Sequence, residues 1–77
     1  MTRNQRYVTE IMNLLNKGDN ANVEYNADTD DINFWYNFDF SSVQMITIPS
    51  SNNEATAKKK MEEITNVIKN ELVERKH

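Results

Sequence analysis

Apolar side chains recur along this chain with two different periods, which predict a helix at each end and strands between them. In the first segment they recur at the spacing of one helical face: Val8, Ile11, Met12 and Leu15. Thr2 stands three residues before Gln5, as in a capping box, in which two side chains bind free backbone amides at a helix start. Gly18 favours a helix end, because glycine adopts the left-handed conformation without a Cβ clash. The pattern predicts a first helix over roughly residues 3–17.

The middle of the chain changes to a period of two, which is typical of strands with one buried face. A short strand is expected around residues 23–27, followed by turn residues at 28–31. Residues 32–40 then alternate strictly: Ile32, Phe34, Tyr36, Phe38 and Phe40 share one face, and Asn33, Trp35, Asn37 and Asp39 share the other. A third strand is expected over residues 43–48, ended by Pro49.

Two registers remain open for the second and third strands. A two-residue loop at Ser41 and Ser42 would place Met45 on the aromatic face, whereas a three-residue loop would place Ile46 and Ile48 there. A slip of one residue exchanges the two faces of a strand, and serine does not select a turn type strongly.

The last segment returns to the helical period. Its apolar stripe contains Ala57, Met61, Ile64, Ile68 and Leu72. Ser51 and Glu54 have the spacing of a second capping box, so a helix is expected over roughly residues 52–74. Such a helix would be about 35 Å long, whereas a nine-residue strand spans about 30 Å. The end near Leu72 is therefore expected to overhang the sheet, where it could fray or pair with a second copy.

The order helix, three strands, helix predicts an α+β fold in one domain, residues 1–77. A three-stranded antiparallel sheet with one apolar face needs a cover, and two amphipathic helices supply one. The opposite face, which carries Trp35, is expected to be open to water. Tryptophan is enriched at the centres of protein interfaces. Trp35 is therefore either an exposed binding anchor or a side chain covered by another part of the chain.

Composition excludes several classes of function. The chain has no cysteine, one glycine and no apolar run of membrane-spanning length, so no disulfide, phosphate-binding glycine loop, membrane span or signal peptide is expected. His77 is the sole histidine and the last residue, which leaves no base for a catalytic serine. Asp28, Asp30 and Asp31 lack the glycine and glutamate of a calcium-binding loop. We therefore expect a protein that is not an enzyme and has no cofactor or metal.

Charge is distributed in blocks. The forty residues 18–57 contain seven acidic residues and no lysine or arginine, whereas both flanking segments are net positive. This separation of sign would steer partners of opposite charge. The acidic block is either a solvated surface that keeps the domain soluble or a docking face for a basic protein. In the second case the binding residues would be Glu24, Asp28, Asp30, Asp31, Asp39 and Trp35.

The order of elements over nearly the whole chain resembles the double-stranded RNA-binding domain. Lys58, Lys59 and Lys60 stand at the start of the last helix, where that family grips phosphates. The resemblance implies RNA binding through these lysines. The loop between the first two strands, which enters the RNA minor groove in that family, is acidic here over residues 28–31. Phosphate would be repelled by this loop, so direct binding of nucleic acid is not expected to be the main function.

Small size, acidity, α/β order and the absence of catalytic groups resemble small phage-encoded inhibitors of the anti-CRISPR type, although no sequence motif is shared. The resemblance implies an inhibitor encoded by a phage or mobile element and acting in the bacterial cytoplasm. Its acidic residues would imitate phosphates and block a basic nucleic-acid-binding site on a host defence protein such as a CRISPR-Cas effector. Arginine binds a carboxylate through two hydrogen bonds much as it binds a phosphate.

Overall fold

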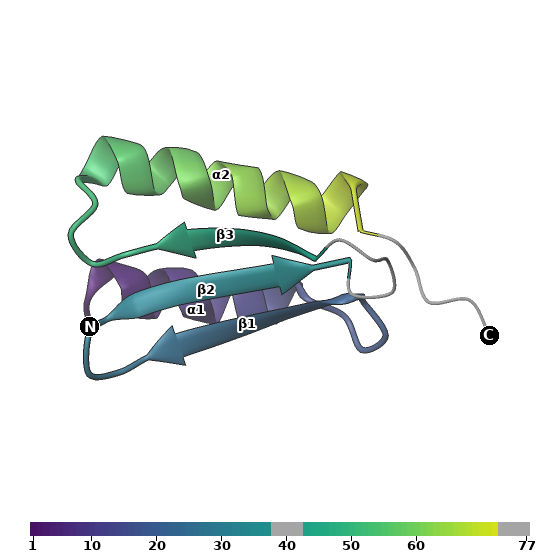
Figure 1. Cartoon of the computed structure of the whole chain (residues 1–77), viewed down its shortest axis with the longest axis horizontal. Coiled ribbons are helices and arrows are strands. Elements are labelled where there is room, and N and C mark those ends of the chain that lie inside the picture. The colour runs from purple at the N-terminus through teal and green to yellow at the C-terminus, as the bar shows by residue number, and fades with distance from the viewer. Residues whose placement is uncertain (38–42, 73–77) are drawn as a thin grey trace.

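A computed structural model describes residues 1–37 and 43–72. The elements are α1 (Arg3–Leu14), β1 (Ala21–Asn26), β2 (Asp31–Tyr36), β3 (Gln44–Ile48) and α2 (Glu54–Asn70). The strands form one antiparallel sheet in the order β1-β2-β3. α1 packs behind β1 and β2, and α2 runs along β3 in the same direction as α1 (Figure 1). The α+β fold expected from the sequence is confirmed.

The register of the sheet decides between the two alternatives that the sequence left open. Phe34 pairs with Ile46 and Ile32 pairs with Ile48, so both isoleucines lie on the aromatic face, and Met45 lies on the opposite face. Residues 38–42, which connect these strands, lie outside the described part of the chain.

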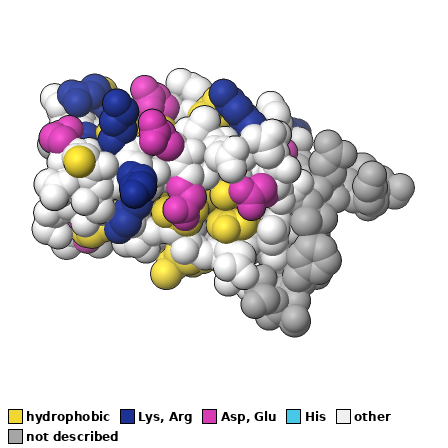
Figure 2. Space-filling view, turned by 90° about the horizontal axis from the view of Figure 1, so that it is seen from above, with side chains coloured by type: hydrophobic (Ala, Val, Ile, Leu, Met, Phe, Trp, Pro, Cys, Tyr) yellow, Lys and Arg dark blue, Asp and Glu magenta, His cyan; other side chains and the backbone are white. Residues whose placement is uncertain are grey.

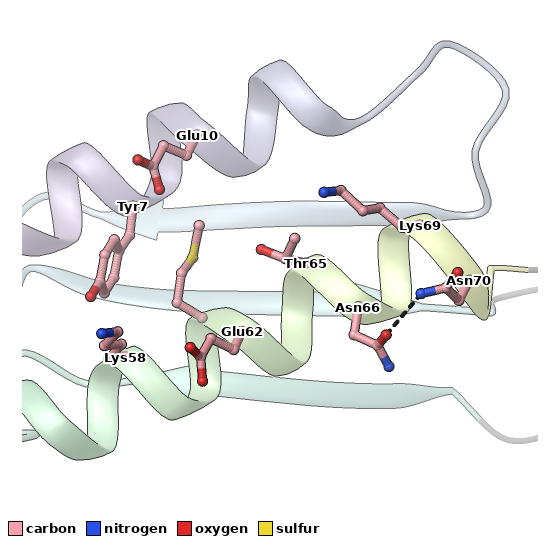
Figure 3. Close-up of a pocket in the computed structure, with 9 residues that line it drawn as sticks. Tyr7, Glu10, Lys58, Glu62, Thr65, Asn66, Lys69 and Asn70 are labelled. Carbon is pink, nitrogen blue, oxygen red and sulfur yellow. Dashed lines mark hydrogen bonds between the residues drawn. The ribbon is translucent and has the colours of Figure 1, made fainter.

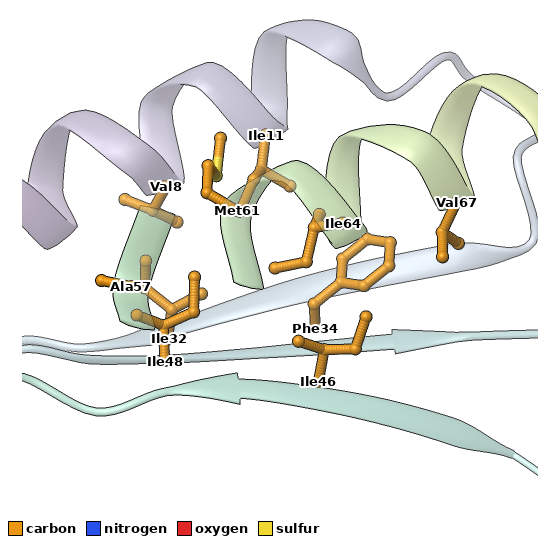
Figure 4. Close-up of a cluster of buried hydrophobic side chains, with 10 residues drawn as sticks. All are labelled: Val8, Ile11, Ile32, Phe34, Ile46, Ile48, Ala57, Met61, Ile64 and Val67. Carbon is orange, nitrogen blue, oxygen red and sulfur yellow. The ribbon is translucent and has the colours of Figure 1, made fainter. Parts of the chain in front are cut away.

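One hydrophobic core lies between the sheet and the two helices (Figure 4). Both helices and the strands β2 and β3 contribute its buried side chains. These are Val8 and Ile11 from α1, Ile32 and Phe34 from β2, Ile46 and Ile48 from β3, and Ala57, Met61, Ile64 and Val67 from α2. Because these strand residues occupy alternate positions, they point to one face of the sheet, and both helices cover that face.

The first helix begins as expected and ends earlier than expected. Thr2 and Gln5 form the capping box. The helix stops at Leu14, because Leu15 turns into an extended conformation (φ −72°, ψ 133°) and packs against the core. Gly18 has a φ of +102°, which favours glycine, but it lies in the following turn and not at the helix end.

The second helix begins later and ends earlier than expected. The capping box at Ser51 is wrong: Asn53 is the N-cap, and its side chain accepts a hydrogen bond from the Thr56 amide at 2.8 Å. The helix ends at Asn70, and Leu72 packs partly buried against the core. The expectation that Leu72 overhangs the sheet is therefore wrong. Residues 73–77 lie outside the described part. Pairing of two copies through this end stays a prediction.

No helix of the described chain is long and apolar enough to cross a bilayer.

The long second strand is also shorter than expected. β2 ends at Tyr36, because Asn37 adopts a left-handed conformation with a φ of +63° that a strand cannot continue. The Asn37 amide instead donates to the Asn20 carbonyl at 2.7 Å. The strand positions expected at Phe38, Asp39 and Phe40 lie outside the described residues.

A polar cluster closes the end of the molecule where both helices begin. The buried Asn4 carboxamide donates to the carbonyl oxygens of Asp30 at 2.7 Å and Ile48 at 2.9 Å. Its oxygen accepts from Arg3, whose guanidinium also donates to the Asn52 carbonyl at 2.6 Å. This cluster joins the start of α1, the β1–β2 turn and the loop that leads into α2.

Replacement of Asn4 by alanine is expected to destabilise the protein strongly. The Asp30 and Ile48 carbonyls would each lose a donor, which predicts a loss of about 2–3 kcal/mol in the free energy of unfolding. Urea denaturation would measure it. Asn13→Ala, at an exposed position of the same helix, is the matched control and should change stability by less than about 0.5 kcal/mol. Equal effects of the two substitutions would contradict the role assigned to Asn4.

Candidate functional site on the open sheet face

The face of the sheet opposite the helices carries no other element in the described part of the chain (Figure 1). Its side chains are those that alternate with the core residues: Asn22, Glu24 and Asn26 from β1, Asp31, Asn33 and Trp35 from β2, and Met45 and Thr47 from β3. We call this surface the open face. Trp35 lies on it, on the side away from Phe34.

One end of the open face is apolar. Trp35 in the central strand pairs with Asn22 on one side and with Met45 on the other. Met45 is 55% exposed, and Val43, directly before β3, is 49% exposed. Trp35 itself is half-buried. This apolar end therefore offers an aromatic ring and a flexible thioether in neighbouring positions.

The other end of the open face is acidic. Glu24 pairs with Asn33, and Asp31 pairs with Asn26. Asp28 is exposed in the turn that joins β1 to β2 at this same end. We call Glu24, Asp28 and Asp31 the acidic end. Asp31 stands four residues from Trp35 along β2, a separation of about 13 Å at the rise of a strand.

Positive side chains are absent from the open face and gather on the helical side. None of the eight open-face positions is lysine or arginine. Every described lysine and arginine belongs to α1, α2 or the loop that follows α1. Seen from above α2, basic, acidic and hydrophobic side chains alternate over the surface (Figure 2). The open face therefore carries carboxylates with no cation among its eight positions, although Arg3 at the start of α1 lies close enough to Asp30 to help lower its pKa.

Asp30 is placed differently from the other acidic residues. Its Oδ1 accepts hydrogen bonds from the Tyr25 hydroxyl at 2.5 Å and the Thr2 hydroxyl at 2.8 Å. The bond from Tyr25, followed by the bond from Thr2, lowers the pKa of Asp30, and the carboxylate raises the pKa of Tyr25. Asp30 has a φ of +59°. Its carboxylate thus holds the β1–β2 turn against the start of α1.

Two polar groups of the open face are fixed by hydrogen bonds. Oδ1 of Asp31 accepts from the Ser50 amide at 2.8 Å, which ties β2 to the loop before α2. Oδ1 of Asn33 accepts from the Thr47 hydroxyl at 2.9 Å, which leaves the Asn33 amide nitrogen directed away from Thr47. Both side chains are therefore held in place by contacts within the domain.

The structure brings together part of the set proposed from the sequence. Glu24, Asp31 and Trp35 share the open face, and Asp28 lies at its acidic end. Asp30 is engaged with Tyr25 and Thr2, and Asp39 lies outside the described residues. Sequence reasoning did not assign Met45 or Val43 to this surface. The register that pairs Ile46 with Phe34 would have placed Met45 on the open face beside Trp35.

A second concave surface lies between the two helices (Figure 3). This groove has a volume of about 460 Å³, and Met61 lies at its floor. Its charged lining residues are Glu10, Lys58, Glu62 and Lys69. Two carboxylates and two ammonium groups give it no preference for ligands of either charge. The described residues contain no cluster of three side chains suited to bind a metal ion.

Comparison of the chain with protein-family models, with curated proteins and with solved structures gave no match.

Replacement of Asp30 by asparagine is expected to lower stability at neutral pH and to have little effect in acid. Because the folded pKa of Asp30 lies below its usual value of 3.8, its contribution is present above that value and is lost as the pH falls through the folded pKa. Asparagine tolerates the left-handed conformation, so the substitution isolates the charge. Urea midpoints at about pH 7 and about pH 2.5 would test this. Asp28→Asn should change neither midpoint, and a similar loss at both pH values would contradict the interpretation.

Trp35 is expected to contribute much less to stability than its neighbour Phe34. Phe34 is fully buried, so Phe34→Ala should cost about 3–5 kcal/mol of unfolding free energy. Trp35 makes cross-strand contacts on an uncovered face, so Trp35→Ala should cost about 1 kcal/mol. Circular dichroism during urea denaturation would measure both variants. A cost for Trp35→Ala close to that for Phe34→Ala would mean that the open face is covered.

Proposed function

We propose that this protein is not an enzyme and acts by docking its open face on a basic surface of another protein. The observation that carries the proposal is the composition of that face. An uncovered sheet surface joins Trp35 and Met45 to the carboxylates of Glu24 and Asp31, and its eight positions include no lysine or arginine. Tryptophan supplies contact area at the centre of interfaces, and carboxylates bind arginine through paired hydrogen bonds.

The partner we propose is a host protein that handles nucleic acid, with a CRISPR-Cas effector as the leading example. Sites that bind nucleic acid are basic, because they neutralise phosphates. An acidic protein face that occupies such a site excludes the nucleic acid from it. The resemblance to small acidic phage-encoded inhibitors supports this role and implies that the protein acts in the bacterial cytoplasm. An interface of standard size needs about 800 Å² from each partner, so the β1–β2 turn would contribute as well as the strands.

Binding of double-stranded RNA through Lys58, Lys59 and Lys60 is the second candidate. Lys58 and Lys59 are exposed in the first turns of α2, which supports this role. The polar cluster of Arg3 and Asn4, however, joins the start of α2 to the acidic β1–β2 turn. Carboxylates at the same end of the molecule would repel phosphates near the lysines. We therefore rank this candidate second.

Neutralisation of the acidic end is expected to abolish partner binding. The variant combines Glu24→Gln, Asp28→Asn and Asp31→Asn, and it leaves Asp30 unchanged because that carboxylate holds the turn. Wild type immobilised in a nuclease-treated bacterial lysate should retain a nucleic-acid-handling protein that the variant loses. Added duplex DNA should release the retained protein, because DNA competes for the same basic site.

The matched control makes the same change in charge on the helical side: Glu10→Gln, Glu62→Gln and Glu63→Gln. It should retain the partner as wild type does. Equal retention by the two triple variants would contradict the proposal. RNA binding would respond in the opposite way. Neutralising the acidic end would raise the affinity for RNA, and Lys58→Gln with Lys59→Gln would lower it. A gel-shift series with duplex RNA at several salt concentrations distinguishes the two.

A further inference from the structure

We infer that the open face recognises its partner through two anchors at a fixed separation, an inference that rests on the proposed function. A lysine or arginine of the partner would bind at the acidic end. An apolar side chain of the same partner segment would lie on Trp35 and Met45. The two partner groups would stand about 13 Å apart, the distance of four strand residues.

The separation is fixed because both anchors belong to β2. This strand is the central one, and it pairs with β1 over all its residues and with β3 from Ile32 to Tyr36. Asp31 is further held by the Ser50 amide. Trp35 lies between Asn22 and Met45 of the neighbouring strands. A partner therefore meets two preformed groups that do not move independently.

The surface between the anchors along β2 and β3 is polar and uncharged, and Glu24 flanks it on β1, directly opposite Asn33. Asn33 and Thr47 occupy it and are joined by a hydrogen bond. The Asn33 amide nitrogen remains available to donate to a passing carbonyl or hydroxyl. An extended partner segment presents alternate side chains to one face at about 6.6 Å intervals. A cation, a small polar residue and an apolar residue at every second position would match Asp31, Asn33 and Trp35 in turn.

The charge of the open face favours a basic protein segment over a nucleic acid and over a second copy of this chain. Phosphates of a nucleic acid would meet Glu24 and Asp31 with no open-face cation to bind them. A second copy of this chain would bring its own Glu24 and Asp31 against the same charges. A basic and apolar segment of another protein satisfies both ends of the face.

Two peptides of identical composition test the spacing. The matched probe is acetyl-Arg-Ser-Thr-Ser-Leu-amide, and the control is acetyl-Ser-Arg-Leu-Thr-Ser-amide, in which the two anchors are adjacent. Trp35 is the sole tryptophan of the chain, so its fluorescence reports binding at the apolar end directly. The matched probe should bind more tightly than the control by up to about fivefold, since one exposed ion pair is worth up to about a factor of five.

Variants then assign the two anchors. Glu24→Gln with Asp31→Asn should remove the difference between the peptides. Asp31→Asn keeps an oxygen acceptor for the Ser50 amide, so the fold is retained. The control pair Glu62→Gln with Glu63→Gln lies on exposed positions of α2 and should preserve the difference.

Equal dissociation constants for the two peptides, or no change in Trp35 fluorescence up to about 10 mM of either, would overturn the two-anchor inference. A stronger fluorescence change with a short RNA duplex, or with increasing concentration of the protein alone, would also overturn it and assign the face to RNA or to a second copy. If the peptides bind equally but the acidic-end variant still loses its captured partner, the proposed function stands and the spacing alone is wrong.

Discussion

The two hydrogen bonds donated by the Asn4 carboxamide hold together three segments that are far apart in the sequence. One bond reaches the carbonyl of Asp30 in the β1–β2 turn, and the other reaches the carbonyl of Ile48 at the end of β3. Asn4 is fully buried, so its carboxamide depends on these protein carbonyls for its hydrogen bonds. The start of α1 is thereby fixed over one end of the sheet. The rest of α1 then lies along β1 and β2, and α2 takes the remaining space beside it.

This arrangement divides the molecule into two chemically distinct sides. Both helices use one face of the sheet, so the core lies on that side, and no other element of the described chain covers the polar and aromatic side chains of the other face. Glu24 and Asp31 are carried by that exposed side, whereas Lys58 and Lys59 are carried by a helix on the opposite side. The block structure of charge in the sequence thus becomes a separation of charge in space, because the middle of the chain forms the sheet and its ends form the helices.

Local patterns were sufficient to predict the order of elements and the direction of Trp35. The capping box of Thr2 and Gln5 and the alternation through Phe34 and Trp35 depend on neighbouring residues alone. The early end of β2 was not predictable, because polarity does not encode the left-handed φ of Asn37. Ser51 and Asn53 are both good N-cap residues, so the pattern could not choose between them.

The candidate site could be predicted only in part, because local patterns show which residues of a strand share a face but do not show the register or contacts between distant residues. Trp35, Glu24 and Asp31 share a face by strand parity. Met45 joined them only once the register was known, because serine turn residues leave the loop length open. Asp30 could not be separated from its acidic neighbours by sequence, since its role depends on the hydroxyl of Thr2, twenty-eight residues away.

The parallel course of α1 and α2 has an electrostatic consequence (Figures 1 and 3). Antiparallel helices largely cancel their dipoles, but these two add, so both partially positive N-termini lie at one end of the domain. Asp30 stands beside the start of α1, and Asp31 is tied to the loop that leads into α2. The helix ends thus offset part of the repulsion among the clustered carboxylates. At the other end, where two partially negative C-termini meet, Lys69 occupies the last turn of α2 and Lys17 follows α1.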